Sequence, residues 1–427
     1  MSSISARTCL LAIFISVSAI SSLSAQPDYV SHGGLKYDAN DWPCWRGARQ
    51  DGIADPNQKL PTRWSETENV VWEAKVPGRG HGSPCVVGNY IYLATCDEGP
   101  KSQSVVCFER STGKQLWQTV VHQSGAMWKN KKGSAASSTV TCDGEQLYIN
   151  FPNSNALFAT SLSLDGKILW QQKVSDYVIH QGYGSSPTIY KSLVIVTADN
   201  KGGGAIAGLD RKTGKIVWTN PRPKLPNYPT PIIFHLDGKD QLILTGCKLV
   251  TSLNPMTGKI IWEADGATEE CVTSTVTDGT HVYSSGGYPK NHVAAYKADG
   301  SKEVAWENGD RVYVPSMVIR NGHIYAVMDA GVAVCWKADT GEELWKSRLG
   351  GNFTSSVVLV DESVFATDEA GKTTMFRADP SGFKKLGTNK LGDEMLATPT
   401  ICGNQLFMRV AHRQDDTRQE VLYCIGE

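Results

Sequence analysis

The sequence has neither a marked excess of one charge nor a long apolar run. Lysine and arginine number 42 against 43 aspartates and glutamates, which gives a net charge of −1. A near-neutral chain gives no indication of binding to nucleic acid or to an anionic membrane surface. No stretch reaches the roughly 18 consecutive apolar residues expected of a transmembrane helix. We therefore predict no nucleic-acid partner and no membrane span.

Motifs that carry metal or nucleophilic chemistry are also missing. The cysteines form no adjacent pair, no C-x-x-C and no C-x-x-C-H, and the nine histidines show no H-x-x-x-H spacing. Such spacings are typical of zinc and haem sites, so we predict no metal site. His81 lies between glycines in GRGHGSP, but no aspartate or serine partner can be assigned to it. We therefore predict no catalytic triad and no catalytic residue.

The first 25 residues have the composition of a secretory signal peptide. Arg7 is their single charged residue, and it precedes a short apolar run at 9–20 and the small residues of SSLSA. This pattern predicts cleavage after Ala25 and export to the periplasm or the cell exterior. The alternative is an N-terminus that is merely disordered. No cysteine stands at the cleavage point, so the pattern does not indicate a lipid anchor.

Ten cysteines remain after this cleavage, in a compartment that would be oxidising. Cys96 and Cys107 flank a predicted strand connection, and they could form a disulfide if their strands pair there. The alternative, which we favour, is that Cys107 is a small buried residue. Cys44, between Trp42 and Trp45, is a second disulfide candidate without an identified partner.

One phrase recurs along most of the chain. IAGLDRKTGKIVW is followed 44 residues later by VTSLNPMTGKIIW, and related phrases end at tryptophans 39 to 53 residues apart. In each phrase β-branched and apolar residues flank a turn such as D-x-x-T-G-K, which predicts a hairpin, and two β-rich runs precede it. Four-stranded repeats of about 40–50 residues are typical of β-propellers. The phrases end at Trp117, Trp170, Trp218, Trp262, Trp306 and Trp345, and at Leu386, where tryptophan is lost and one residue is added.

A small residue stands six positions before the turn glycine of each tryptophan-ended phrase, as at Gly208 and Cys335. Packed sheets leave little room between them, so a small side chain allows the next sheet to approach. We expect the tryptophan of the fourth strand to cover this position and to dock one blade on another. Cys424 occupies the matching place in the last unit. The predicted docking residues are Trp72, Trp117, Trp170, Trp218, Trp262, Trp306 and Trp345.

The count of repeats predicts how the ring closes. Seven full units run over 83–391, and an eighth, 394–427, has three strands but no fourth. The segment 68–78 reads as an isolated fourth strand, with Trp72 in the aromatic place. Pairing of this strand with the C-terminal unit would close the ring and protect the sheet edges. We therefore predict an all-β, eight-bladed propeller of four-stranded antiparallel blades, closed by the N-terminal strand.

The predicted domain organisation has three parts. A signal peptide, 1–25, precedes an N-terminal extension, 26–66, and the propeller spans 67–427. The extension holds Trp42, Trp45 and Trp64 among glycine, aspartate and proline residues. We expect these indoles to pack on the ring. The alternative is an exposed patch that binds a partner.

The repeated phrase, idealised as A-x-D-x-x-T-G-K-x-x-W, resembles the PQQ-like repeat of quinoprotein-type eight-bladed propellers. The best copies are 209–218 and 337–345, and the resemblance covers roughly 62–427. It implies one of two branches: alcohol and sugar dehydrogenases that bind pyrroloquinoline quinone with calcium, or exported bacterial non-enzymatic propellers, among them a scaffold of outer-membrane protein assembly. The first branch typically carries a vicinal disulfide, and its haem-bearing members carry C-x-x-C-H. This chain has neither.

We therefore expect an exported binding or protein-interaction scaffold of the periplasm or cell envelope, with no cofactor. The alternative is a dehydrogenase dependent on pyrroloquinoline quinone and calcium. The expected partner is another envelope protein, or a small ligand, at the mouth of the channel. In a competing interpretation the aromatic residues there simply plug the channel. The predicted mouth residues are Arg79, His81, Trp128, Lys129, His180, Tyr183, Tyr228, Glu270, Tyr313 and Phe353.

Overall fold

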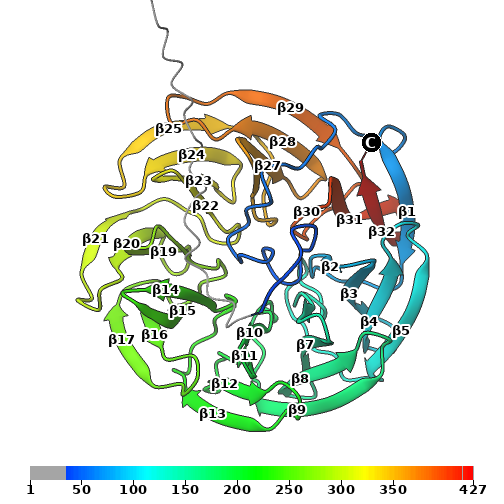
Figure 1. Ribbon diagram of the computed structural model, residues 1–427, viewed down its shortest axis with the longest axis horizontal. Helices are drawn as coiled ribbons and strands as arrows, with labels where there is room; N and C mark the ends of the chain where they lie inside the picture. Colours follow the sequence, from blue (N-terminus) through cyan, green and yellow to red (C-terminus); the bar gives the residue numbers. More distant parts are fainter. Residues whose placement is uncertain (1–34, 416, 427) are drawn as a thin grey trace, which may run out of the picture.

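The computed structural model describes residues 35–415 and 417–426, so the predicted signal peptide lies outside the described residues. The described residues contain strands and no helix, and they form eight four-stranded antiparallel sheets arranged as a ring (Figure 1). The prediction of an eight-bladed propeller is confirmed. In this part of the chain no helix could cross a membrane.

Blades 1 to 7 use their strands in chain order, from an innermost strand A to an outermost strand D. Blade 1 has β2 (Cys85–Val87), β3 (Tyr90–Asp97), β4 (Ser102–Glu109) and β5 (Gln115–His122). Blade 2 has β6 (Thr141–Cys142), β7 (Gln146–Asn153), β8 (Ala156–Ser163) and β9 (Ile168–Asp176). Blade 3 has β10 (Thr188–Tyr190), β11 (Leu193–Thr197), β12 (Ala205–Asp210) and β13 (Ile216–Pro221). Blade 4 has β14 (Ile232–Leu236), β15 (Lys239–Gly246), β16 (Leu249–Leu253) and β17 (Ile260–Asp265).

The remaining blades continue around the ring. Blade 5 has β18 (Val276–Thr277), β19 (His281–Gly286), β20 (His292–Lys297) and β21 (Val304–Asn308). Blade 6 has β22 (Val318–Arg320), β23 (His323–Val327), β24 (Val332–Lys337) and β25 (Glu343–Arg348). Blade 7 has β26 (Val358–Val360), β27 (Ser363–Thr367), β28 (Lys372–Arg377) and β29 (Lys385–Lys390). Blade 8 has β30 (Thr400–Cys402), β31 (Gln405–Gln414) and β32 (Thr417–Ile425), completed by β1 (Val70–Val76).

The ring closes as the sequence predicted. Strand β1 pairs antiparallel with β32, with Trp72 opposite Cys424 and Val76 opposite Glu420. Figure 1 shows the blue N-terminal strand beside the red C-terminal strand. The last blade is therefore built from both ends of the described chain, and β1 is its strand D.

The tryptophans of strand D lie between consecutive blades. Within a blade Trp218 stands opposite Gly208, and Trp345 stands opposite Cys335. A Cβ on Gly208 would come within 2.3 Å of the Trp218 indole nitrogen, which explains the small residue there. In five cases the indole N–H donates to a carbonyl in the C–D turn of the next blade, at 2.8 to 3.2 Å. These donors are Trp72, Trp117, Trp170, Trp306 and Trp345.

Blade 7 departs from this pattern, and the extension compensates. Its register places Gly387 in the tryptophan position and Met375 in the small-residue position. In other blades a strand-B aromatic pairs with the strand-D tryptophan, as Tyr325 does with Trp345 at 6.2 Å between ring centroids. In blade 7 the strand-B Phe365 stacks instead on Trp64 of the extension, at 6.3 Å. Trp64 therefore takes the place of the missing indole.

The extension closes one end of the channel. Trp42 exchanges two backbone hydrogen bonds with Val86 of blade 1, at 2.7 and 2.9 Å. Arg46 donates to the carbonyl of Met317 in blade 6, and the Ala54 amide donates to Leu359 of blade 7. The segment thus crosses the centre of the ring, as the dark blue trace in Figure 1 shows.

Cys96 and Cys107 do not form a disulfide, and the favoured interpretation of Cys107 as a small buried residue is confirmed. Cys107 stands opposite Tyr92, whereas Cys96 lies four residues further along the same strand, opposite Gln103. At about 3.3 Å per residue the two positions are too far apart for a bridge. Cys44 is also a free thiol, and its sulfur lies 3.1 Å from the Gly47 carbonyl oxygen. All ten cysteines of the described residues are free and buried.

Candidate functional site

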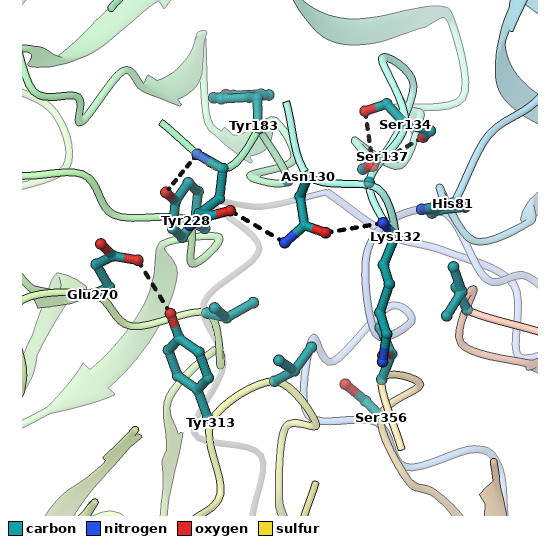
Figure 2. A pocket seen from close by; sticks show the side chains of 18 of the residues that line it. His81, Asn130, Lys132, Ser134, Ser137, Tyr183, Tyr228, Glu270, Tyr313 and Ser356 are labelled. Carbon is teal, nitrogen blue, oxygen red and sulfur yellow. Dashed lines mark hydrogen bonds between the residues drawn. The ribbon is translucent and has the colours of Figure 1, made fainter. Parts of the chain in front are cut away.

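A cavity of about 560 Å³ opens at the mouth opposite the extension (Figure 2). Each blade contributes to its wall from the segment that precedes strand A, where the chain returns from the rim to the centre. The cavity is therefore built by loops and not by the strands themselves. Each blade supplies at least one lining residue, and examples from blades 1 to 8 in turn are His81, Ser134, His180, Tyr228, Glu270, Tyr313, Thr354 and Leu396.

A belt of hydroxyl residues surrounds the channel at the base of these loops. Every blade places a serine or threonine two residues before strand A. In seven of the eight junctions the backbone N–H of one belt residue donates to the hydroxyl of the next blade, at 2.9 to 3.2 Å. The belt satisfies backbone groups that neither sheet pairs, and it couples each loop to its neighbour. Its members are Ser83, Thr139, Ser186, Thr230, Ser274, Ser316, Ser356 and Thr398.

The remaining junction is where the extension enters the cavity. Between blades 4 and 5 the Ser274 hydroxyl donates to the Thr230 carbonyl, at 3.3 Å. The same hydroxyl accepts the indole N–H of Trp45, at 2.9 Å. Trp45 also lines the cavity, so its side chain forms the floor. The channel is thus converted into a cup with one open end.

A buried carboxylate is held on one side of the cup. Glu270, only 4% exposed, accepts from the Tyr313 hydroxyl at 3.2 Å, and its other oxygen lies 3.0 Å from Nε2 of His180. Figure 2 shows Glu270 and Tyr313 pointing toward each other across neighbouring loops. Burial raises the pKa of the Tyr313 and Tyr228 hydroxyls, and the charge of Glu270 raises both further. The tyrosines therefore remain neutral hydrogen-bonding groups.

Two further aromatic residues of the wall, Tyr183 and Tyr228, are fixed by hydrogen bonds. The Tyr183 hydroxyl donates to the Thr197 carbonyl at 2.9 Å, and the Tyr228 hydroxyl accepts from the Gln181 amide at 3.3 Å. Tyr288, from the connection between β19 and β20, lines the same cavity and is 51% exposed. Hydrogen-bonded rings around a concave space give a preformed wall that is apolar with a few polar groups, as in many binding sites.

An ion pair spans the rim of the cup. Lys132 extends from the long loop between β5 and β6, and its Nζ lies 2.8 Å from Glu369 of blade 7. Lys132 also lines a second cavity of about 510 Å³, together with Arg79 and Arg413. The open mouth therefore carries a charged rim of both signs above an aromatic interior.

The structure brings together six of the ten predicted mouth residues: His81, His180, Tyr183, Tyr228, Glu270 and Tyr313 line the cavity. Arg79 lies in the neighbouring cavity. Trp128 packs against a hydrophobic cluster of blades 1 and 2, Lys129 is exposed, and Phe353 is buried in a cluster shared by blades 6 and 7.

The belt and several further lining residues, among them Trp45, Lys132 and Tyr288, were missed. The recurrence of serine or threonine two positions before each strand A, visible in GSP, SSP and TPT, could have revealed the belt. Trp45, Lys132 and Tyr288 stand at positions that no other repeat shares, and no sequence signal marks them.

His81 predicts a pH dependence of stability. Burial lowers its pKa well below the ordinary 6.5, and the charges of Arg79 and Arg409 lower it further. The folded protein therefore keeps His81 neutral, while the unfolded chain takes up a proton as the pH falls below about 6.5. We expect the urea midpoint to fall between pH 7.5 and 5.5, and a His81→Gln variant to show a smaller fall. His122 and His292 also have lowered pKa values, so they should account for the fall in midpoint that remains in the variant. Equal pH slopes for variant and wild type would contradict this assignment.

The cavity does not fit calcium-bound pyrroloquinoline quinone. Calcium takes about six to eight oxygen ligands, several of them carboxylates. Glu270 is the one carboxylate among the lining residues, and a single carboxylate supplies too few of these ligands. Within 35–415 and 417–426, no group of three or more histidine, cysteine, aspartate or glutamate residues could hold a metal ion.

Comparisons with known proteins agree with the architecture. A family model described as outer membrane protein assembly factor BamB matches residues 59–176, 101–312 and 290–382, which together cover most of the chain. The chain is 24% identical over 390 residues to outer membrane protein assembly factor BamB of Yersinia pestis, covering 83% of this chain and 89% of that protein.

Two solved structures share the fold. BamB from Moraxella catarrhalis has a TM-score of 0.58 at 15% identity, covering 83% of this chain and 96% of its own. A europium-containing methanol dehydrogenase has a TM-score of 0.64 at 12% identity, covering 92% and 99%. At these identities the likeness shows a common propeller and leaves the activity open.

Proposed function

The chain belongs to the PQQ-like propeller family described as outer membrane protein assembly factor BamB, and from that membership we propose that it is an exported envelope propeller that binds a segment of another protein at the open mouth of its ring. The relative in Yersinia pestis is named for outer-membrane protein assembly. A role in the assembly or maintenance of the envelope is the corresponding role for this chain. The six predicted mouth residues that line the cavity, and Arg79 in the neighbouring cavity, belong to the same proposal.

The observation that carries this proposal is the difference between the two ends of the channel. One end is covered by the extension, with Trp42 and Arg46 buried against the blades. The other end is an open cup with aromatic walls and a charged rim. A rigid ring with one accessible concave face is suited to holding an extended segment without moving its own backbone.

Site-specific photo-crosslinking tests the proposal. p-Benzoylphenylalanine at position 288, on the open mouth, should give a discrete adduct with one envelope protein in the native host. The matched control is position 90, because Tyr90 is also an exposed tyrosine, at 40%, but lies at the turn between β2 and β3, on the end that the extension covers. No adduct at 288, or equal adducts at both positions, would refute the proposal. Saturable binding of pyrroloquinoline quinone with calcium, accompanied by alcohol or sugar oxidation, would favour the dehydrogenase instead.

A further inference from the structure

Glu270 differs from the other deeply buried carboxylates of this protein. Four of those each form an ion pair with an arginine or lysine: Asp143 with Arg211, Asp199 with Arg222, Asp368 with Lys372, and Glu420 with Arg409. The Glu270 side chain is 5% exposed, and its ion-pair partner among the described residues is His180. A buried carboxylate without a permanent cation is costly, because it loses hydration that nothing fully replaces.

The partners of Glu270 leave part of its acceptor capacity unused. A carboxylate can accept about four hydrogen bonds. The Tyr313 hydroxyl supplies one, and His180 supplies another when its Nε2 carries a proton. Both partners come from the loops before strand A and line the cavity, as Glu270 does. The space that the carboxylate faces is therefore the cavity of about 560 Å³.

No cation of the wall is available to fill this deficit. The Lys132 ammonium is paired with Glu369 at the rim, 2.8 Å away. Arg311 stacks on the Tyr313 ring with 5.0 Å between the guanidinium carbon and the ring centroid, and it donates to the Gly287 carbonyl. His81 is kept neutral by burial, which lowers its pKa. The negative charge therefore remains on the Glu270 side of the cup.

We infer that the cavity binds a basic side chain, the ammonium of a lysine or the guanidinium of an arginine, with Glu270 as its counter-ion. The rings of Tyr228, Tyr288 and Tyr313 line the same space, and aromatic faces attract organic cations. The cavity lies within the size range of small-ligand pockets and accepts a long basic side chain with the backbone that carries it. This inference rests on the proposed function, since the side chain belongs to the segment held at the mouth.

The test compares small probes that carry one positive charge with neutral probes of similar shape. N-acetyl-arginine amide and N-acetyl-lysine amide are titrated against the full protein by calorimetry or ligand-detected NMR, beside the neutral N-acetyl-citrulline amide and N-acetyl-norleucine amide. We expect the basic amides to bind at least about 10-fold more tightly than their neutral counterparts, a difference of about 1.4 kcal/mol. This comparison uses wild-type protein and so does not depend on the folding of any variant. Equal affinity for arginine and citrulline amides would overturn the inference.

A pair of variants assigns the effect to Glu270. Glu270→Gln keeps an acceptor for Tyr313 but removes the charge, and it should weaken the arginine amide at least about 10-fold. Asp361→Asn makes the same change in the turn between β26 and β27, on the end of the ring that the extension covers, and should leave the affinity within about twofold of wild type. Unchanged binding by Glu270→Gln, with an unchanged melting temperature, would also overturn the inference.

The two proposals fail in different ways. Suppose the adduct at position 288 forms equally in wild type and in Glu270→Gln, while the basic amides do not bind. The proposal of a protein partner at the mouth then stands, and the inference of a basic side chain bound by Glu270 is wrong. If the basic amides bind but position 288 gives no adduct, the cup takes a free amine or guanidine and the protein partner is wrong.

Discussion

A Trp64→Ala variant should lose about 3–5 kcal/mol of unfolding free energy in urea titrations, the range typical of removing a buried tryptophan from a core. The Trp64 side chain is buried at 3% exposure and stacks on Phe365, the strand-B aromatic of blade 7. Its backbone N–H donates to the side chain of Asn389 on β29, at 3.1 Å. Removal of the indole would leave a cavity between blades 7 and 8, and strand D cannot fill it because its residue there is Gly387.

A matched set of variants separates this role from ordinary burial. Trp262→Ala removes a strand-D tryptophan that is buried to a similar extent, and it should cost about as much, whereas Val217→Ala, at an exposed position on β13, should change stability by less than about 0.5 kcal/mol. Gly387→Trp with Met375→Ala rebuilds the usual pair on β29 and β28, and should recover part of the loss in the Trp64→Ala background. A Trp64→Ala protein as stable as wild type would show that the extension only rests on the ring.

An Arg409→Met variant should lose about 3 kcal/mol, measured in the same titration. Arg409 and Glu420 form a fully buried ion pair on β31 and β32, both about 1% exposed at the side chain. Arg409 also donates to the Ala94 carbonyl of blade 1 at 2.7 Å, and Glu420 accepts from the Gly80 amide at 3.0 Å. The pair thus joins blade 8 to blade 1 where the ring closes. Its removal leaves Glu420 buried with Arg418 as its remaining cation.

Replacing both partners should be milder than replacing one. Arg409→Met with Glu420→Met exchanges a buried charge pair for apolar side chains, which is often close to neutral in other proteins. Arg320→Met removes a pair with the exposed Asp361 and should cost less than about 1 kcal/mol. If Arg409→Met cost no more than Arg320→Met, the pair would have no part in closing the ring.

The repeated phrase made the fold predictable because it contains both the turn residues of a hairpin and the residues that pack one blade against the next. The turn glycines, the small residue on strand C and the tryptophan on strand D recur at fixed spacing, and the lone Trp72 strand could be matched to a unit that lacked one. The packing of blade 7 could not be predicted in this way. Trp64 of the extension replaces the indole that Gly387 lacks, and residues so far apart in sequence are brought together only by the closed ring.

The cup was predictable only where it follows the repeat. Tyr183, Tyr228 and Tyr313 lie in the loops before strand A, so their approximate place follows from the blade pattern. Phe353 lies in an equivalent loop but points into a core, because loop conformation rather than position decides where a side chain goes. Trp45 reaches the cavity from outside the repeats, and its contact with Ser274 depends on the path of the extension across the ring.

The split last blade also constrains the order in which this protein can fold. A ribosome makes β1 first and β32 last, and most domains begin to fold while the chain is still growing. Here β1 must wait, without its hydrogen-bonding partner, until all the other described strands have been synthesised. The circle can therefore be sealed only after β32 has been synthesised, and a chain cut short before Thr417 would retain an open edge on blade 8 and a solitary first strand.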